Sequence, residues 1–358
     1  MPIYRRFATV PWGLALIATQ LPLSACCAPA AAVKTAPRAD ALATVSSGHS
    51  TALDPRADRS PLHREHPLVG KIYSVHEQRF ISPQALLAGI QTGAPLWLGE
   101  KHDNPDHHAL QGWVIAQHFS DKSCKVAIFE MIDDGQRADL DKFQQTPRSA
   151  SDSSALAAAL QWERSGWPDF ALYEPVFAAA LDHCSAISPG SFPRSRSMEF
   201  ARARSAALPS DFAALHLLQT PLPPQQHAAI SAEMEAAHCG LLPENMLDSM
   251  VFIQRVRDAR LAATLNNSAT QSAVVVAGNG HVRKDRGGPQ VLQQLIGTAG
   301  VTVSFQEVVP GADTAQAHAE LTEQDPLPYD FVWFTAATDD GDPCEQLRKH
   351  HSQSAAQQ

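Results

Sequence analysis

The sequence predicts an α/β protein with a mainly parallel central sheet flanked by helices, in a single large domain with a helical insertion. Short apolar runs bounded by turn residues recur along the chain, and helical patterns separate them, as in strands joined by crossover helices. Polar residues follow several of these runs directly. The region 68–345 is also long enough to bury a core of its own.

The N-terminus predicts export. Two arginines precede an apolar region from about Val10 to Leu23, too short for a membrane span, so residues 1–25 are expected to be a signal peptide. The following Leu23-Ser24-Ala25-Cys26 resembles a bacterial lipobox, which predicts that Cys26 is lipidated, with palmitate among its acyl groups. The alternative is an ordinary signal peptide that leaves Cys26 free. Cys27 stands where an aspartate would favour inner-membrane retention, so we expect the outer membrane, facing the periplasm.

Composition divides the rest of the chain. Residues 26–67 are rich in Ala, Pro, Ser and Thr and predict a flexible tether, whereas 68–345 form the α/β domain and 346–358 a disordered tail. The formal net charge is −9, and removing the two arginines of the signal peptide makes it −11, which argues against nucleic acid as a partner.

Cysteines and histidines constrain the chemistry. Beyond the anchor, Cys124, Cys184, Cys239 and Cys344 permit two disulfides in any of three pairings. The absence of a CxxC spacing argues against a thiolate zinc site. The 16 histidines, several of them clustered, favour metal or haem chemistry.

The first well-defined strand is Pro95–Gly99, and a helix follows it closely. Asp103 or Asn104 can cap a helix that begins at Pro105, where the missing N–H does no harm, and that runs to about Phe119.

Chemically useful side chains surround this helix start. Glu100 and His102 lie on the strand-to-helix loop. Within the helix, His108 and Gln111 share a face at a spacing of three residues, and His107 and Gln111 at a spacing of four.

Two further strands end in similar residues. Lys125–Phe129 is followed by Glu130, a carboxylate that is costly to bury without a partner, although a hydrogen-bonded structural glutamate is the alternative. Ala273–Gly278 is the clearest strand, and Asn279-Gly280 permits a tight turn before His281.

A long helix from about Pro243 to Leu265 carries Gln254 and Asp258 on its apolar stripe. Buried polar groups need partners, so these two either form a network with Arg257 or line the site. The remaining expected helices lie near 135–145, 156–164, 172–183, 198–208 and 289–296. The remaining expected strands are a short one at 186–187 and two more at 301–309 and 330–335. A proline-broken connection over 217–224 is expected to lead into a helix that ends at 239–240.

In parallel sheets, ligands bind beyond the carboxyl ends of the strands. This rule predicts that Glu100 and the residues that follow the other strands meet at one edge. There His102, Glu130 and His281 could bind a divalent metal ion such as zinc or manganese. We expect hydrogen bonds that orient these ligands to come from residues that do not touch the metal themselves, namely Asp103, Gln111, Gln254 and Asp258.

Several segments together resemble the ChaN-like lipoprotein family, over roughly 68–345. The segments that carry the resemblance are Leu98–Pro105 with His107-His108 and Gln111, Phe129-Glu130, Trp162-Glu163 with Trp167-Pro168 and Tyr173, Gln254 with Arg257-Asp258, Ala277–Arg283, Tyr329–Thr335 and Asp342–Glu345.

The family belongs to a superfamily that includes the Tiki proteases and erythromycin esterases and is marked by two Gly-x-x-His motifs and a glutamate. Gly99–His102, Gly278–His281 and Glu130 match these elements. Arg194 matches a Pro-Arg position of the family, although the preceding Ser188–Ser191 departs from the amide-rich sequence expected there.

The resemblance implies two classes of function. A ChaN-like protein would bind haem noncovalently for iron uptake, with His107, His108 or Tyr173 as candidate iron ligands. A hydrolase related to the Tiki or esterase branch would use the metal site, with Glu100 as general base. A lipoprotein that only scaffolds partners is a third class. The expected partners are haem or another small molecule, the membrane through the lipid anchor, and a second copy of the chain in a homodimer.

Overall fold

The computed structural model of the protein describes residues 59–90, 93–146, 153–268, 272–341 and 344–345. The predicted signal peptide, the predicted lipidation site Cys26, most of the predicted tether and the tail after residue 345 lie outside the described residues.

An eight-stranded sheet forms the centre of the described chain, in the order β2-β1-β8-β7-β3-β6-β4-β5. β1 pairs antiparallel with both β2 and β8, and every other pairing is parallel. The predicted α/β fold with a mainly parallel sheet is therefore confirmed. The strands are β1 (Ile72–Ser74), β2 (Arg79–Ile81), β3 (Leu96–Glu100), β4 (Cys124–Asp133), β5 (Cys184–Ser191), β6 (Ala273–Gly278), β7 (Val301–Glu307) and β8 (Phe331–Thr335).

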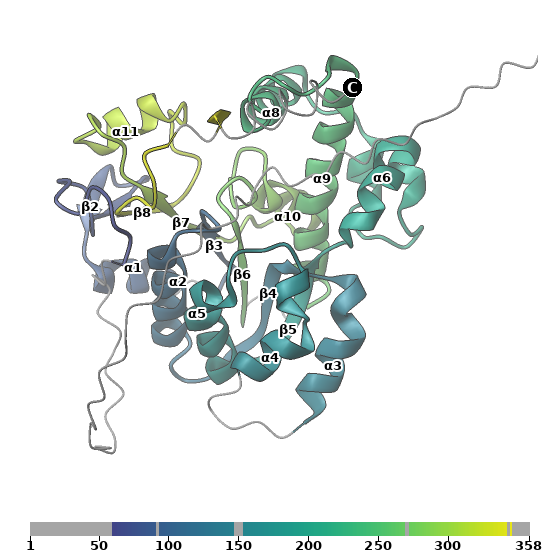
Figure 1. The fold of residues 1–358 in the computed structure, drawn as a ribbon, viewed down its shortest axis with the longest axis horizontal. Helices are drawn as coiled ribbons and strands as arrows, with labels where there is room; N and C mark the ends of the chain where they lie inside the picture. Colours follow the sequence, from purple (N-terminus) through teal and green to yellow (C-terminus); the bar gives the residue numbers. More distant parts are fainter. Residues whose placement is uncertain (1–58, 91–92, 147–152, 269–271, 342–343, 346–358) are drawn as a thin grey trace, which may run out of the picture.

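Helices join most of these strands (Figure 1). They are α1 (Pro83–Ile90), α2 (Pro105–His118), α3 (Arg137–Gln145), α4 (Ser153–Ala159), α5 (Phe170–His183), α6 (Ser197–Ala203), α7 (Leu215–Gln219), α8 (Pro224–Ala237), α9 (Glu244–Asn266), α10 (Gly288–Ile296) and α11 (Ala315–Leu321). Short 3₁₀ turns are η1 (Asp134–Gln136), η2 (Trp162–Arg164), η3 (Arg194–Arg196) and η4 (Arg204–Ala207).

The central strands β3 and β6 are buried on both faces, which explains their continuous apolar runs. Along β3, Leu96 and Leu98 belong to a core with side chains of α1, α2 and α5, whereas Trp97 points to the other face and joins residues of α9, α10 and α11. Successive side chains of a strand alternate in this way. The central strands therefore lie between two helical layers that fix their ends.

The helical insertion lies between β5 and β6 and contains α6, α7, α8 and α9 (Figure 1). It has a smaller core of its own, in which Phe200 and Leu218 pack with Val256 of α9. Because α9 also contributes Leu261 and Leu265 to the core of the sheet, it connects the insertion to the sheet.

The predicted end of the tether at residue 67 is too late. The backbone N–H groups of Arg59 and Ser60 donate to the two carboxylate oxygens of Asp106, at 2.6 and 2.9 Å, and Leu62 pairs with Ala337 in an antiparallel bridge. Asp106 lies in the first turn of α2, where a carboxylate is favoured by the helix dipole. Its hydrogen bonds hold residues of the predicted tether against the domain.

Two disulfides connect distant parts of the chain. Cys124 bonds Cys184 and Cys239 bonds Cys344, which selects one of the three pairings that the sequence allowed. Within the part of the chain that the structure describes, no helix is both long enough and apolar enough to span a membrane.

Candidate functional site

The sheet order brings the predicted site residues together. β3 and β6 are parallel neighbours in which Glu100 pairs with Gly278, and β6 also pairs with β4, where Phe129 lies opposite Val276. The carboxyl ends of these three strands therefore meet at one edge. Glu100, Glu130 and His281 lie there at 2, 5 and 6 % exposure. β4 continues past Glu130 to Asp133, so this glutamate lies within the strand rather than after it.

The two Gly-x-x-His segments fit into each other. A Cβ atom on Gly99 would overlap Oδ1 of Asn279, and one on Gly278 would lie 3.1 Å from Nε2 of His102. Each glycine thus leaves room for a side chain of the other segment. The Asn279 backbone N–H also donates to the carbonyl of Glu100 at 2.8 Å, which holds the turn against β3.

His281 lies between two carboxylates. Its Nδ1 is 2.7 Å from Oδ1 of Asp258, and its Nε2 is 3.2 Å from Oε1 of Glu130. The Gln254 amide nitrogen is 3.2 Å from the same Nδ1. Burial would lower the pKa of His281, but the charges of Glu130 and Asp258 outweigh it and raise this pKa to about 10. The ring is therefore a buried cation at neutral pH.

The pKa values of the two carboxylates beside His281 shift in opposite directions. Burial raises the pKa of Asp258 to about 6, although His281 opposes the shift. For Glu130, burial is outweighed by the charge of His281, and its pKa falls below the usual range. Glu130 also accepts the Gly278 backbone N–H at 2.9 Å, which fixes its second oxygen.

Glu100 is surrounded by donors. His102 Nδ1 lies 2.7 Å from Oε1, the Tyr173 hydroxyl donates to that oxygen at 3.3 Å, and His108 Nδ1 lies 2.9 Å from Oε2. Burial alone would raise the pKa of Glu100, but these histidines lower it below its usual range. The carboxylate is ionised, and both of its oxygens already face protein groups.

His102 is the most accessible histidine of this cluster. Its side chain is 25 % exposed, and its ring meets the Trp167 ring edge to face at 4.8 Å between centroids. Among the described residues, Nε2 has no hydrogen-bond partner, while Nδ1 is held by Glu100. Burial lowers the pKa of His102, but the hydrogen bond to Glu100 and the charge of Glu130 raise it overall.

The three predicted haem ligands are fully buried. Nδ1 of His107 accepts the Lys101 backbone N–H at 2.8 Å, and its Nε2 lies 2.9 Å from the Thr335 hydroxyl. Both nitrogens of His108 face oxygens, one of them the His102 carbonyl at 3.1 Å. The ring of Tyr173 contacts that of His108 at 4.0 Å between centroids, and its hydroxyl donates to Glu100. In this arrangement, neither histidine offers a free ring nitrogen to iron.

The residues predicted to support the site divide into two groups. Gln254 and Asp258 contact His281, and Gln111 lies 3.3 Å from His108 Nδ1 while it donates to the carbonyls of β3. Asp103 and Arg194 are exposed and do not reach the cluster: Asp103 pairs with Lys101 at 3.5 Å, and Arg194 lies near Gly166.

Sequence reasoning missed a second polar group at the same edge of the sheet. Lys101 Nζ lies 3.0 Å from Glu307, which ends β7, and 2.7 Å from the Thr338 hydroxyl. The signal was available, because Glu307 is the last residue of β7 just as Glu100 is the last residue of β3. Tyr329 was also missed; its hydroxyl donates to the Asn279 carbonyl at 3.2 Å and supports the turn before His281.

The arrangement bears directly on metal binding. No group of three or more His, Cys, Asp or Glu side chains in the described chain is placed to hold a metal ion. The predicted ligands His102, Glu130 and His281 do converge, but His281 already faces a carboxylate with each ring nitrogen. A metal ion at His281 would have to displace a proton and separate this ion pair.

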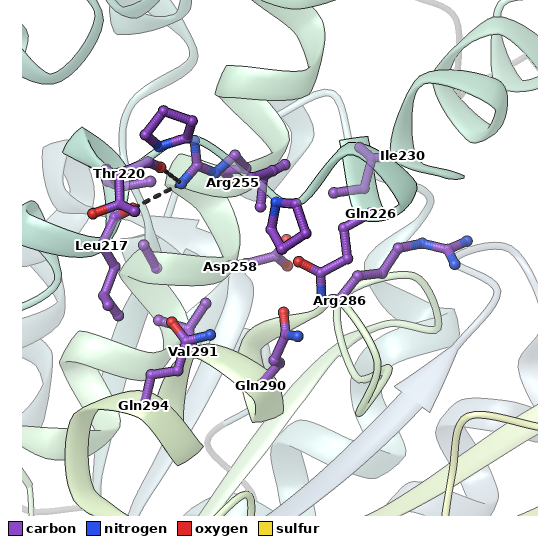
Figure 2. Close-up of a pocket in the computed structure, with 15 residues that line it drawn as sticks. Leu217, Thr220, Gln226, Ile230, Arg255, Asp258, Arg286, Gln290, Val291 and Gln294 are labelled. Atoms are coloured by element: carbon purple, nitrogen blue, oxygen red, sulfur yellow. Dashed lines mark hydrogen bonds between the residues drawn. The ribbon is translucent and has the colours of Figure 1, made fainter. Parts of the chain in front are cut away.

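A cavity of about 340 Å³ adjoins the cluster through Asp258 (Figure 2). It lies between α8, α9, α10 and the segment that joins α7 to α8. None of its lining residues is a His, Tyr, Met or Cys, the side chains that ligate haem iron. This cavity therefore does not supply an axial haem ligand.

Fold and site together define an α/β protein with a buried histidine–carboxylate cluster at the carboxyl edge of a parallel sheet. The chain belongs to the family described as haem-binding uptake, Tiki superfamily, ChaN, whose profile matches residues 86–292. That range contains both Gly-x-x-His segments and Glu130. Among curated proteins, nothing matches the chain.

Solved structures with a similar fold include one described as cofacial heme binding to ChaN of Campylobacter jejuni. It is 20% identical, the match covers 73% of this chain and 95% of that chain, and the TM-score is 0.56. An erythromycin esterase, EreC, in its open conformation is 11% identical over 79% of this chain and 86% of its own, with a TM-score of 0.37. The first comparison supports the α/β fold; the second structure is distant.

Proposed function

We propose that this protein is a haem-binding lipoprotein of the bacterial cell envelope that takes part in haem or iron uptake. The observation that carries the proposal is the family match over residues 86–292. The similar Campylobacter jejuni protein is described as binding haem cofacially. Two haems stacked face to face are readily held between two subunits, so we extend the proposal to a homodimer.

The structure favours His102 as the iron ligand over the three candidates named from sequence. Histidines that bind metals usually donate their other ring N–H to a carboxylate, and Glu100 receives Nδ1 of His102 at 2.7 Å. Nε2 has no hydrogen-bond partner among the described residues, and the neighbouring Trp167 offers an aromatic surface. Haem bound here would lie at the edge of the sheet, supported by Glu100 and Trp167.

The predicted anchor supports a position at the outer membrane, facing the periplasm. The N-terminal sequence has the basic start, apolar region and lipobox of a lipoprotein signal, with Cys26 as the acylated residue. The disulfides Cys124–Cys184 and Cys239–Cys344 suit an oxidising compartment such as the periplasm.

Haem titration tests the proposal on a chain produced without residues 1–26. The wild type should shift the Soret band at micromolar haem, and His102→Ala should weaken binding by at least tenfold. His76→Ala is the control, because His76 is exposed and follows β1, whose last residue pairs with the first residue of β8, so that it lies at the opposite edge of the sheet. Since a proton competes for Nε2, affinity should also fall at acidic pH. No Soret shift at micromolar haem would reject haem binding.

The convergence of His102, Glu130 and His281 favours one alternative, a metal-dependent hydrolase of the Tiki or esterase type with Glu100 as general base. Metal analysis of the same preparations separates the two functions. Stoichiometric zinc or manganese without a Soret shift would support the hydrolase, and His102→Ala and His281→Ala should then each reduce metal content. Normal metal content in both variants would exclude a shared site.

A further inference from the structure

The cavity beside Asp258 is lined by both apolar and polar side chains. Apolar surface comes from Leu222 in the segment before α8, Ile230 in α8 and Val291 in α10. Arg255 and Gln290 contribute polar groups from α9 and α10 (Figure 2). A volume of about 340 Å³ lies at the lower end of the range typical of small-molecule sites.

Arg255 is a partly buried cation without a carboxylate partner. Its Nη2 donates to the carbonyl oxygens of Leu217 and Thr220, at 2.7 and 2.9 Å (Figure 2). No carboxylate lies within ion-pair distance of it in the described part of the chain. Asp258 acts on Arg255 electrostatically, but it is bonded to His281 at 2.7 Å. The guanidinium therefore keeps both an unmatched charge and unused N–H donors.

Arg286, the second arginine of the cavity, differs from Arg255 because it has carboxylate partners. It contacts Glu233 at 2.8 Å and Asp285 at 3.0 Å, so its charge is already balanced. A partly buried charge without a partner is costly, and a ligand that supplies the opposite charge removes that cost. Of the two arginines, only Arg255 offers this gain.

We propose that this cavity binds a small amphipathic carboxylate, with the carboxylate at Arg255 and a short acyl chain along Leu222, Ile230 and Val291. A carboxylate oxygen accepts a charge-assisted hydrogen bond from a guanidinium N–H, and the Nε and Nη1 N–H groups of Arg255 make no hydrogen bond with the described residues. The apolar side chains of the lining then bury the chain of the ligand. The site is separate from the proposed haem site, since its lining lacks iron-ligating side chains.

Fluorescence competition tests the charge requirement on the whole mature protein. The probe 8-anilinonaphthalene-1-sulfonate, an aromatic anion, should bind with increased fluorescence. Octanoate should displace it at concentrations at least tenfold lower than octan-1-ol or octylamine, which have the same chain without the negative charge. Equal displacement by all three compounds would overturn the proposal, because it would show binding by the apolar side chains alone.

Two substitutions on α9 locate the charge. Losing a charge-assisted hydrogen bond costs about 1.5–3 kcal/mol, so Arg255→Gln should weaken octanoate binding by about tenfold to a hundredfold, and Arg255→Lys should weaken it less. Arg257→Gln makes the same charge change two residues further on, outside the cavity, and should leave binding unchanged. Unchanged octanoate affinity in folded Arg255→Gln would reject the site. If circular dichroism shows that this variant is unfolded, the comparison of octanoate with octan-1-ol decides the question.

Discussion

His102 and His281 follow the same four-residue pattern but have different surroundings. His281 has a carboxylate at each ring nitrogen, whereas His102 has one carboxylate and one nitrogen without a hydrogen bond among the described residues. The first arrangement stabilises a cation in place, and the second leaves an atom available to a ligand. The sequence motif alone therefore does not assign the two histidines the same role.

The surroundings of His281 predict its protonation. Its pKa rises from 6.5 in a model peptide to about 10 in the folded protein, because both carboxylate charges outweigh the effect of burial. A raised pKa means that the stabilisation is fully present below pH ~6.5 and is lost as the pH rises through 10. Nitrogen-15 NMR should show an imidazolium at pH 8. The free energy of unfolding should fall between pH 8 and 10.5 by a few kcal/mol as an order of magnitude.

His281→Gln is the control for this pH dependence. The variant should be less stable at pH 8, because it leaves two buried carboxylates without their cation. Its stability should also vary less between pH 8 and 10.5. A neutral His281 ring at pH 8 in the wild type would contradict the interpretation.

Sequence reasoning found this cluster but not its pairing. The rule about carboxyl ends of parallel strands brought Glu100, Glu130 and His281 to one edge before the strand order was known. Which carboxylate faces which histidine depends on β6 lying between β3 and β4, and short sequence patterns do not encode that order. For the same reason, the full burial of His107 and His108 could not be foreseen.

At the scale of single elements, the sequence predicted a helix or strand boundary correctly where a capping residue or a proline marks it. Pro105 is the first residue of α2, as predicted, and of the two predicted caps, Asp103 and Asn104, the structure selects Asn104. By contrast, the strand predicted at 186–187 extends over Cys184–Ser191, because pairing with β4 overrides the weak strand preference of serine, proline and glycine. The predicted connection over 217–224 contains part of helix α7.

Asn104 should therefore be unusually costly to replace. Its Oδ1 accepts from the backbone N–H of Asp106 at 2.9 Å, and its Nδ2 donates to Glu307 and to the carbonyl of Ala336. Loss of the cap costs about 0.5–2 kcal/mol, and each buried partner left unsatisfied adds about 1–3 kcal/mol. Chemical denaturation of Asn104→Ala should show a loss of about 2–5 kcal/mol in unfolding free energy.

Thr314→Ala is the matched control, because it removes the N-cap of another helix, α11. Thr314 caps α11 through the Ala317 N–H at 3.1 Å, but it is exposed and makes no comparable tertiary contacts with the part of the chain that the structure describes. Its replacement should cost about 1 kcal/mol. Equal losses in the two variants would show that the contacts of Asn104 with Glu307 and Ala336 contribute nothing measurable.

At the scale of the whole molecule, the disulfides follow from the sheet order. Cys124 and Cys184 begin the neighbouring strands β4 and β5 and are partners in their register. Once β4 and β5 are neighbours, the pairing is determined, but the sequence could not select it because it did not give the strand order. Cys239 and Cys344 then pair with each other. The two disulfides thus use all four cysteines that follow the predicted lipobox and its neighbour Cys27.

Adjacent cysteines give the anchor proposal a sharp test. In a lipobox, only the cysteine that directly follows the small residues becomes the acylated first residue of the mature chain. Cys26→Ser should abolish incorporation of labelled palmitate and release the protein from membranes in cell fractionation. Cys27→Ser changes the same chemical group one residue later, so the protein should stay acylated and sediment with the membranes. Acylation of Cys26→Ser, or its loss in Cys27→Ser, would place the lipid on a different residue and shift the start of the mature chain.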